Sequence, residues 1–343
     1  MPVEPEMKQQ LLEAYAKYPE QAKKLYGDEP FELKNILKYW VRPFNSDNHF
    51  IPTDTVYVTI DKEAVRRSGM KLQGDSIPDR MVISLKGKSA LYKGDLMMLE
   101  MIANANWERP IYVATTVGAE NYMNLGENFV QEGLANRITP FTTNRDGRIV
   151  PGMTNFDTDK TYDNVMNRFK FGGANTPGIY FDETVMQTCY THRRLMSQLA
   201  LRLTQEAQYE RMIGNDSIAA EKMKKASLVL ERVEKEFPQA NVPHDYQSGS
   251  MDIVRSLIAV GNNDKAKELI GILWKKSEQY FKYYCSQAPA QFVASQRDCV
   301  YHLYLMSTLS EQAAAIDKKL GEDYDKLLLE FESIYRGRGG NFQ

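Results

Sequence analysis

The sequence has few of the features that are typical of metal binding. Among 343 residues there are three cysteines and four histidines, and the cysteines form no CxxC pair and no zinc spacing. The histidines are scattered with no partner one helical turn away, although a metal site needs several ligands that converge. The sequence therefore predicts no metal site and no bound cofactor.

Long apolar runs and a strong charge of one sign are also missing. No run approaches the ~18–20 apolar residues that span a bilayer, and the N-terminus lacks the basic and apolar regions of a signal peptide. The formal net charge of -2 argues against a strongly basic nucleic-acid-binding protein. On these features the chain fits a cytosolic protein and, equally well, a piece cut from a larger membrane protein.

The common sequence signatures of enzymes do not occur either. There is no GxGxxG after a strand, no GxxxxGK[ST], no HExxH and no GxSxG. Carboxylates are plentiful, so counting alone does not exclude an acid pair of the glycosidase type. Unpaired surface acids are nevertheless the usual case, and we do not expect this segment to be an enzyme.

The three thiols, Cys189, Cys285 and Cys299, fall in stretches of helical character. A free buried cysteine in such a stretch acts as a small apolar residue. A disulfide between Cys285 and Cys299 stays open, and the odd count leaves at least one thiol free or paired with another molecule. Cysteine usage therefore does not identify the compartment.

What the sequence does contain is an ordinary globular composition, with 43% hydrophobic and 26% charged residues. The length favours two domains. In the first half, strand 81–85, a helix from about Gly94 to Asn104 and strand 109–115 predict a βαβ unit with parallel strands. We expect a helical N-terminal extension over 1–50 and an α/β or α+β domain with this βαβ unit over 51–178.

The second half changes to a helical period after the glycine-rich segment that ends at Gly178. Ala226, Leu230 and Val233, followed by Pro238, match the offsets of a tetratricopeptide unit. The sequence thus predicts an all-α, tetratricopeptide-like array of helical hairpins over 179–343, with an irregular helical bundle as the alternative. His192-Arg193-Arg194, at the start of a long helix, is expected to be a solvated face, with an anion site as the alternative.

Three segments carry a resemblance to a known family. They are the run from Asp95 to Tyr112 (DLMMLEMIANANWERPIY), the run from Glu132 to Pro140 (EGLANRITP), and Phe171-Gly172-Gly173. From about residue 50 to about residue 284 the chain resembles the soluble C-terminal part of bacterial membrane proteins first catalogued as a domain of unknown function. That family is similar to the transmembrane protein O-mannosyltransferases.

The resemblance implies a compartment and a parent protein. Its members are multi-spanning, glycosyltransferase-like proteins with an extracytoplasmic, tetratricopeptide-bearing tail. It implies a domain on the periplasmic side of the inner membrane, tethered through transmembrane segments that this sequence does not include. The acidic loop motif expected to carry catalysis belongs to that other part, so no catalytic residue transfers to this sequence.

We therefore expect a non-catalytic accessory or interaction domain. Its expected partners are an acceptor polypeptide or a partner protein, and its own membrane domain; a sugar contact stays open, and nucleic acid is not expected. The alternatives are a carbohydrate-active enzyme domain with a carboxylate site near Tyr112, Asn136 and Arg137, or a purely structural cap on the membrane domain. The candidate binding surface comprises Tyr112, Asn136, Arg137, Tyr190, Arg194, Tyr246 and Arg255.

Overall fold

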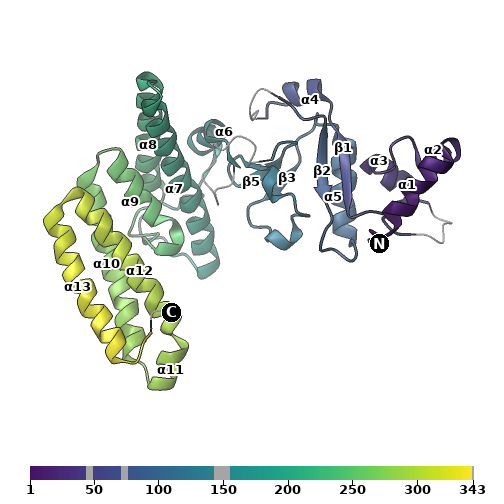
Figure 1. Cartoon of the computed structure of the whole chain (residues 1–343). Coiled ribbons are helices and arrows are strands. Elements are labelled where there is room, and N and C mark those ends of the chain that lie inside the picture. Colours follow the sequence, from purple (N-terminus) through teal and green to yellow (C-terminus); the bar gives the residue numbers. More distant parts are fainter. Residues whose placement is uncertain (44–48, 71–75, 143–154, 342–343) are drawn as a thin grey trace. The chain divides into compact units, whose positions relative to one another are not determined.

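The structure is a computed structural model in which the chain divides into two compact units, Met1–Asp157 and Thr158–Gln343. The first unit combines short helices with two small sheets, and the second is an all-helical array (Figure 1). This confirms the predicted order, an α+β part followed by an all-α part. The structure describes residues 1–43, 49–70, 76–142 and 155–341.

The first sheet is a pair of antiparallel strands, β1 (Thr55–Thr59) and β2 (Arg80–Ser84). Alternate residues of both strands are buried, as in a sheet with one face on a core. The second sheet has the order β3-β5-β4-β6, and only β4 and β6 run parallel. Its strands are β3 (Tyr112–Ala114), β4 (Phe129–Gln131), β5 (Ala135–Ile138) and β6 (Asn155–Phe156).

The predicted βαβ unit is wrong. Helix α5 (Lys93–Ala105) does connect β2 with β3, but the two strands belong to different sheets and each pairs with an antiparallel neighbour. The chain leaves α5 through Asn106 and Trp107, both with positive φ, at 48° and 61°. Local periodicity identified each element correctly, but it carries no information about which strand becomes the partner.

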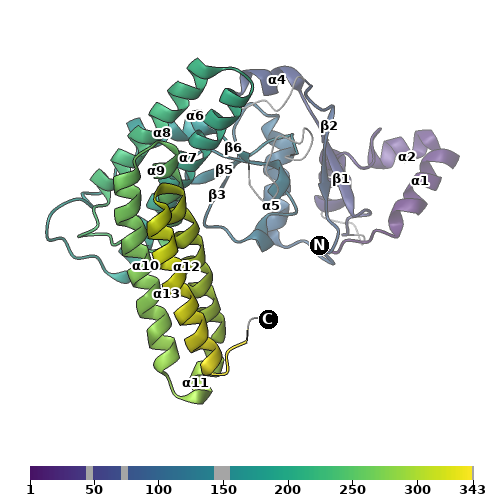
Figure 2. The same cartoon turned by 60° about the vertical axis from the view of Figure 1, so that its left-hand side comes forward.

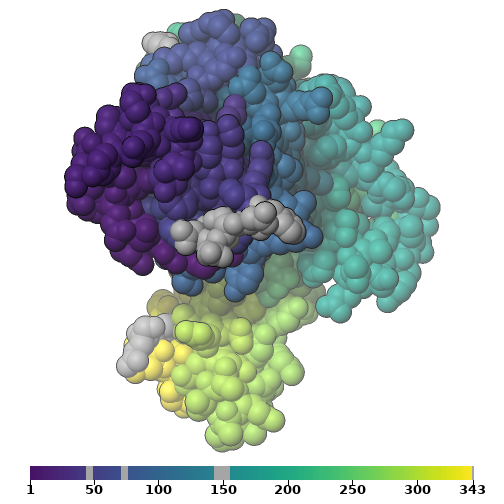
Figure 3. Space-filling view, turned by 90° about the vertical axis from the view of Figure 1, so that its right-hand side faces the viewer, coloured from purple at the N-terminus to yellow at the C-terminus, as the bar shows by residue number. Residues whose placement is uncertain are grey.

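Residues 7–41 are largely helical, as predicted, and they pack within the first unit. Leu33, Ile36 and Trp40 lie in the same apolar cluster as the buried residues of β1 and β2. Figure 3 shows this segment, in purple, packed directly against the residues that follow it. Its elements are α1 (Met7–Lys17), α2 (Pro19–Tyr26), α3 (Leu33–Ile36) and the π-helical turn η1 (Leu37–Val41); α4 (Lys62–Arg67) follows β1.

The second unit consists of helices that pack against their neighbours in the chain. Helix α7 packs against α8, α9 against α10, and α12 against α13; α7 also contacts α9, and α10 contacts α12. Figure 2 shows α10, α12 and α13 side by side, with α11 at one end. The helices are α7 (Glu183–Met212), α8 (Asp216–Glu236), α9 (Ser250–Ala259), α10 (Asn263–Ser286), α11 (Pro289–Ala294), α12 (Gln296–Ile316) and α13 (Lys318–Gly337).

The apolar stripe predicted for α8 is confirmed. Ala219, Ala226, Leu230 and Val233 are buried, and so is Phe237 directly after the helix. Small residues in such a stripe allow two helices to approach closely, which explains the extensive contact between α7 and α8. In the ranges that the structure describes, no helix has both the length and the apolar content for crossing a membrane.

The division between the two units lies between Asp157 and Thr158, earlier than the expected boundary after Gly178. Helix α6 (Thr158–Asp163) belongs to the helical unit because the Thr158 hydroxyl lies 3.0 Å from a carboxylate oxygen of Glu206 in α7. The glycine-rich segment is held to the same unit, since the Asn241 amide donates to the carbonyl of Ala174 over 2.9 Å. Tertiary hydrogen bonds thus place these residues with the helices.

Candidate functional site

A single buried guanidinium holds the loop between α8 and α9. Arg193 of α7 is completely buried. Its Nη2 donates to the carbonyls of Phe237 and Val242, over 2.6 and 2.5 Å, and its Nη1 donates to that of Pro243 over 3.0 Å. Burial lowers the pKa of Arg193 to about 10, so the side chain stays charged at neutral pH. The expectation of a solvated face at this position is therefore wrong.

Further polar contacts fix the end of the same loop. The Arg194 Nε donates to the carbonyl of Gln247 over 3.1 Å, and Lys276 of α10 lies 2.5 Å from the carboxylate of Asp245. Burial alone would lower the pKa of Lys276, but the contact with Asp245 raises it above its ordinary value. The loop is thus fastened to α7 on one side and to α10 on the other.

This fixed loop positions a histidine beside a glutamate of α8. His244 is almost completely buried; its Nε2 lies 3.2 Å from Glu234, and its Nδ1 lies 2.9 Å from the Ser250 hydroxyl. Burial by itself would raise the pKa of Glu234, but the hydrogen bond with His244 and the positive charge of Arg193 hold it below its ordinary value. Glu234 is therefore ionised at neutral pH.

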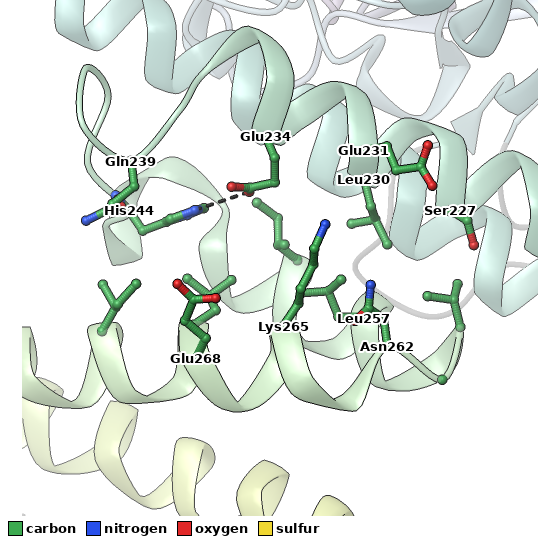
Figure 4. A pocket seen from close by; sticks show the side chains of 15 residues that line it. Ser227, Leu230, Glu231, Glu234, Gln239, His244, Leu257, Asn262, Lys265 and Glu268 are labelled. Carbon is green, nitrogen blue, oxygen red and sulfur yellow. Dashed lines mark hydrogen bonds and ion pairs between the residues drawn. The ribbon is translucent and has the colours of Figure 1, made fainter.

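Glu234 and His244 form one end of a cavity of about 450 Å³ that is lined by α8, α9, α10 and the loop before α9. Figure 4 shows Glu234 and His244 pointing toward each other, while Lys265 and Glu268 rise from α10 on the opposite wall. The floor is apolar and the rim is polar. The floor consists of Leu230, Ile253, Leu257, Val260, Leu269 and Ile272; the polar lining consists of Ser227, Glu231, Glu234, Gln239, His244, Asn262, Lys265 and Glu268.

The cavity has the chemistry of a binding pocket. An apolar floor with a few polar groups that set orientation is typical of sites that hold a ligand. Three carboxylates and one ammonium belong to its lining. Across the residues that the structure describes, no three His, Cys, Asp or Glu side chains are grouped as a metal ion would require.

The charged residues of this cavity were not among those predicted from the sequence. Glu231 and Glu234 lie on α8 beside its buried stripe, and Lys265 and Glu268 occupy the equivalent position on α10. Charges that flank an apolar stripe at helical spacing were the available signal. What the sequence did not reveal is that the two flanks line the same opening.

A group of aromatic rings lies on another part of the helical unit. Tyr246, before α9, has its ring centroid 5.3 Å from that of Tyr301 and 5.5 Å from that of His302. Tyr280 stacks on His302 at 5.0 Å. Near these rings, Tyr283, Tyr301 and Tyr304 are exposed. Tyr246 was a predicted binding residue, and the ring group around it is a second surface suited to contact with a partner.

The other predicted residues of this unit have different environments. Tyr190 is buried, and burial together with the charge of Asp245 raises its pKa. Arg194 is occupied by the loop contact described above. Arg255 is exposed and lies 3.5 Å from Asp252 in its own helix. None of these three lines the cavity.

In the first unit, the predicted site residues Tyr112, Asn136 and Arg137 lie on paired strands, with Tyr112 opposite Arg137. The Tyr112 hydroxyl donates to Glu132 over 2.6 Å, and Arg137 lies 3.6 Å from the same carboxylate. Arg137 also donates to the carbonyl of Ser68 over 2.9 Å, and Asn136 is buried. Burial and the bond to Glu132 raise the pKa of Tyr112 to about 12.

These contacts make the Tyr112 group a network within the sheet. The alternative of an enzyme required a cleft at the carboxyl ends of parallel strands, where open α/β sheets bind ligands. The strands β3 and β5 that carry these residues are antiparallel. The geometric basis of that alternative is therefore missing from this pair of strands.

A family model matches the first part of the chain. Residues 6–160 match the family model described as TMEM260-associated domain 2. The matched region coincides closely with the first unit, Met1–Asp157, and ends within α6. It supports the coarser part of the resemblance noted in the sequence, a link to a membrane protein. No curated protein matches the chain, and no solved structure matches it.

Proposed function

We propose that this chain is a non-catalytic accessory module of a membrane glycosyltransferase-like protein, and that its helical unit binds extended polypeptide. The polypeptide is an acceptor or a segment of a partner protein. The proposal includes a location on the periplasmic side of the inner membrane and a tetratricopeptide-like arrangement of the hairpins. The family resemblance and the match over residues 6–160 support the link to a membrane protein.

The cavity between α8, α9 and α10 is the observation that carries the binding role. Its volume of about 450 Å³ is in the range of pockets that hold small ligands or single side chains with adjoining backbone. Stacked helical hairpins commonly present such openings to extended peptides. The exposed tyrosines Tyr283, Tyr301 and Tyr304 add rings of a type that is enriched at protein interfaces.

Site-specific photo-crosslinking tests this role on the full 343-residue chain. A photoreactive benzoylphenylalanine replaces Asn262, at the exposed rim of the cavity, and a matched variant carries it at Lys318, exposed on α13. The probe is reduced, carboxamidomethylated ribonuclease, an unfolded polypeptide that contains most side-chain types. We expect crosslinks from position 262 and few from position 318. Equal yields at both positions, or none at either, would refute polypeptide binding at the cavity.

A further inference from the structure

Building on the proposed function, we infer that the cavity between α8, α9 and α10 receives a lysine or arginine side chain of an extended polypeptide. The occupant follows from the distribution of charge and apolar surface in the lining. Both features are needed to identify the occupant: the acidic groups suit a positive charge, and the apolar floor suits the stem of a basic side chain.

The charge of the lining is predominantly negative. Glu231 and Glu268 are exposed and form no hydrogen bond or ion pair with any residue that the structure describes. Glu234 is held by His244, but its side chain is still 39% exposed. Against these three carboxylates, the lining contains one lysine, Lys265. A second cation that enters the cavity therefore finds two carboxylates without partners.

The floor explains why the cation should be a side chain with a long apolar stem. Leu230, Leu257 and Leu269 contribute apolar surface below the carboxylates. The methylenes of lysine or arginine cover such surface while the charged group reaches the rim. An apolar side chain of the same length would cover the floor equally well but would gain nothing at the rim. An acidic side chain would face three carboxylates.

The opposite wall contains a built-in competitor. Lys265 and Glu268 rise from α10 toward α8, which carries Glu231 and Glu234 (Figure 4). The positive charge of Lys265 contributes to the lowered pKa of Glu234, so its ammonium lies within electrostatic range of that carboxylate. A bound basic residue would share these carboxylates with Lys265. Removal of Lys265 should therefore strengthen binding, whereas removal of a carboxylate should weaken it.

Two isoleucines in the lining make the test direct. With ¹³C-labelled isoleucine methyl groups, Ile253 and Ile272 report on occupation of the cavity, and Ile83 in the first unit serves as the control. The probes are blocked nonapeptides of glycine and serine with lysine, norleucine or glutamate at the centre. We expect the lysine peptide to bind about 3–10-fold more tightly than the norleucine peptide. This preference should largely disappear at about 0.5 M NaCl.

Two matched variants separate a recognition role from a structural one. Glu268→Gln should weaken the lysine peptide about threefold and leave the norleucine peptide unchanged. Lys265→Gln should tighten the lysine peptide by a similar factor. Both positions are exposed, so neither change should alter thermal unfolding. Equal affinity for lysine and norleucine, or weaker binding in both variants, would overturn the inference.

The two proposals fail in different ways. If position 262 crosslinks to unfolded polypeptide but lysine and norleucine peptides bind equally, the preference for basic residues is wrong and polypeptide binding stands. If position 262 does not crosslink and no peptide shifts the Ile253 and Ile272 methyl signals, the proposed function itself is wrong.

Discussion

Each unit of the chain buries an arginine, and the two guanidinium groups are stabilised in different ways. Arg137 in the first unit lies within 3.6 Å of Glu132, a carboxylate that also accepts from Tyr112. Arg193 in the helical unit forms no ion pair with any residue that the structure describes, and donates instead to carbonyls of Phe237, Val242 and Pro243. One arginine joins side chains of neighbouring strands, whereas the other holds a stretch of backbone.

The difference shows that the helical unit fixes its buried arginine without using a carboxylate from the described part of the chain as an ion-pair partner. Arg193 donates to backbone carbonyls, and the nearby Glu234 lies 3.2 Å from His244 and belongs to the lining of the cavity. In the first unit the acid beside the buried arginine, Glu132, contacts both Arg137 and Tyr112.

The largest effect is expected from replacing the two arginines by methionine. Arg193→Met leaves three buried carbonyls without a donor, and we expect a loss of about 3–5 kcal/mol in the unfolding free energy of the helical unit. Arg137→Met removes the cation that lies beside the buried carboxylate of Glu132 and should cost a similar amount. Hydrogen-exchange mass spectrometry at increasing urea concentrations measures the unfolding of each unit separately.

Rescue distinguishes the two cases. Adding Glu132→Gln to Arg137→Met removes the buried negative charge as well as the positive one and should restore part of the lost stability. No second side-chain change can do so for Arg193→Met, since its partners are backbone carbonyls. If the helical unit of the Arg193→Met variant unfolded at the same urea concentration as that of the wild type, the role assigned to this guanidinium would be wrong.

A smaller loss should follow from Gly249→Ala, at the start of α9. Gly249 has φ of +79°, and a Cβ at this position would lie 2.9 Å from the Arg194 Cα of α7. The strain and the displacement of α9 should cost about 1–3 kcal/mol. Gly261→Ala is a matched control for the strain alone, because it also has positive φ but nothing within 4 Å of its Cβ. Thermal unfolding should separate the two variants.

A smaller loss of stability is expected from a change in the hydrogen-bond network around Tyr112 in the first unit. Tyr112→Phe removes the hydroxyl that donates to Glu132, and we expect a loss of about 1 kcal/mol. Because burial and the bond to Glu132 raise the pKa of Tyr112 to about 12, Tyr112→Phe should remove one phenol from those that ionise near pH 12 in an ultraviolet pH titration. A normal titration of Tyr112 would contradict its burial beside Glu132.

The smallest effect concerns acid stability of the helical unit. The pKa of Glu234 in the folded chain is below its ordinary value of 4.5, so the stabilisation is present above about that pH and is lost as the pH falls through the folded-state value. Glu234→Gln should therefore lower the stability at pH 7, change little at pH values below the folded-state pKa, and so flatten the decline of stability below pH 4.5. Glu231→Gln, without the histidine partner, is the control, and acid titrations followed by circular dichroism provide the measurement.

Local features of the fold were predictable from the sequence. The stripe through Ala226, Leu230 and Val233 gave α8 correctly, because helical periodicity depends only on neighbouring residues. The partners of β2 and β3 were not predictable in the same way. Strand pairing joins residues far apart in the chain, and the strand–helix–strand order alone was compatible with a parallel crossover that the structure does not contain.

The same limit applied to the sites. Arg193 was expected on a solvated face. Its burial could not be predicted from neighbouring residues, because it depends on carbonyls 44 to 50 residues further along the chain. Tyr246 was one of the predicted binding residues, but its ring neighbours Tyr301 and His302 come from a helix that begins 50 residues later. Charges that line the cavity were visible as residues and became a site only through the packing of α8, α9 and α10.

The way in which the loop before α9 is fastened has a consequence for how ligand preference can change over evolution. The walls of the cavity are held through Arg193 and Gly249, which are not part of its lining. A substitution near either residue can widen or narrow the opening while every residue that touches the ligand stays the same. Homologous chains with identical linings can therefore differ in the size of the residue they accept, and comparison of lining residues alone would miss it.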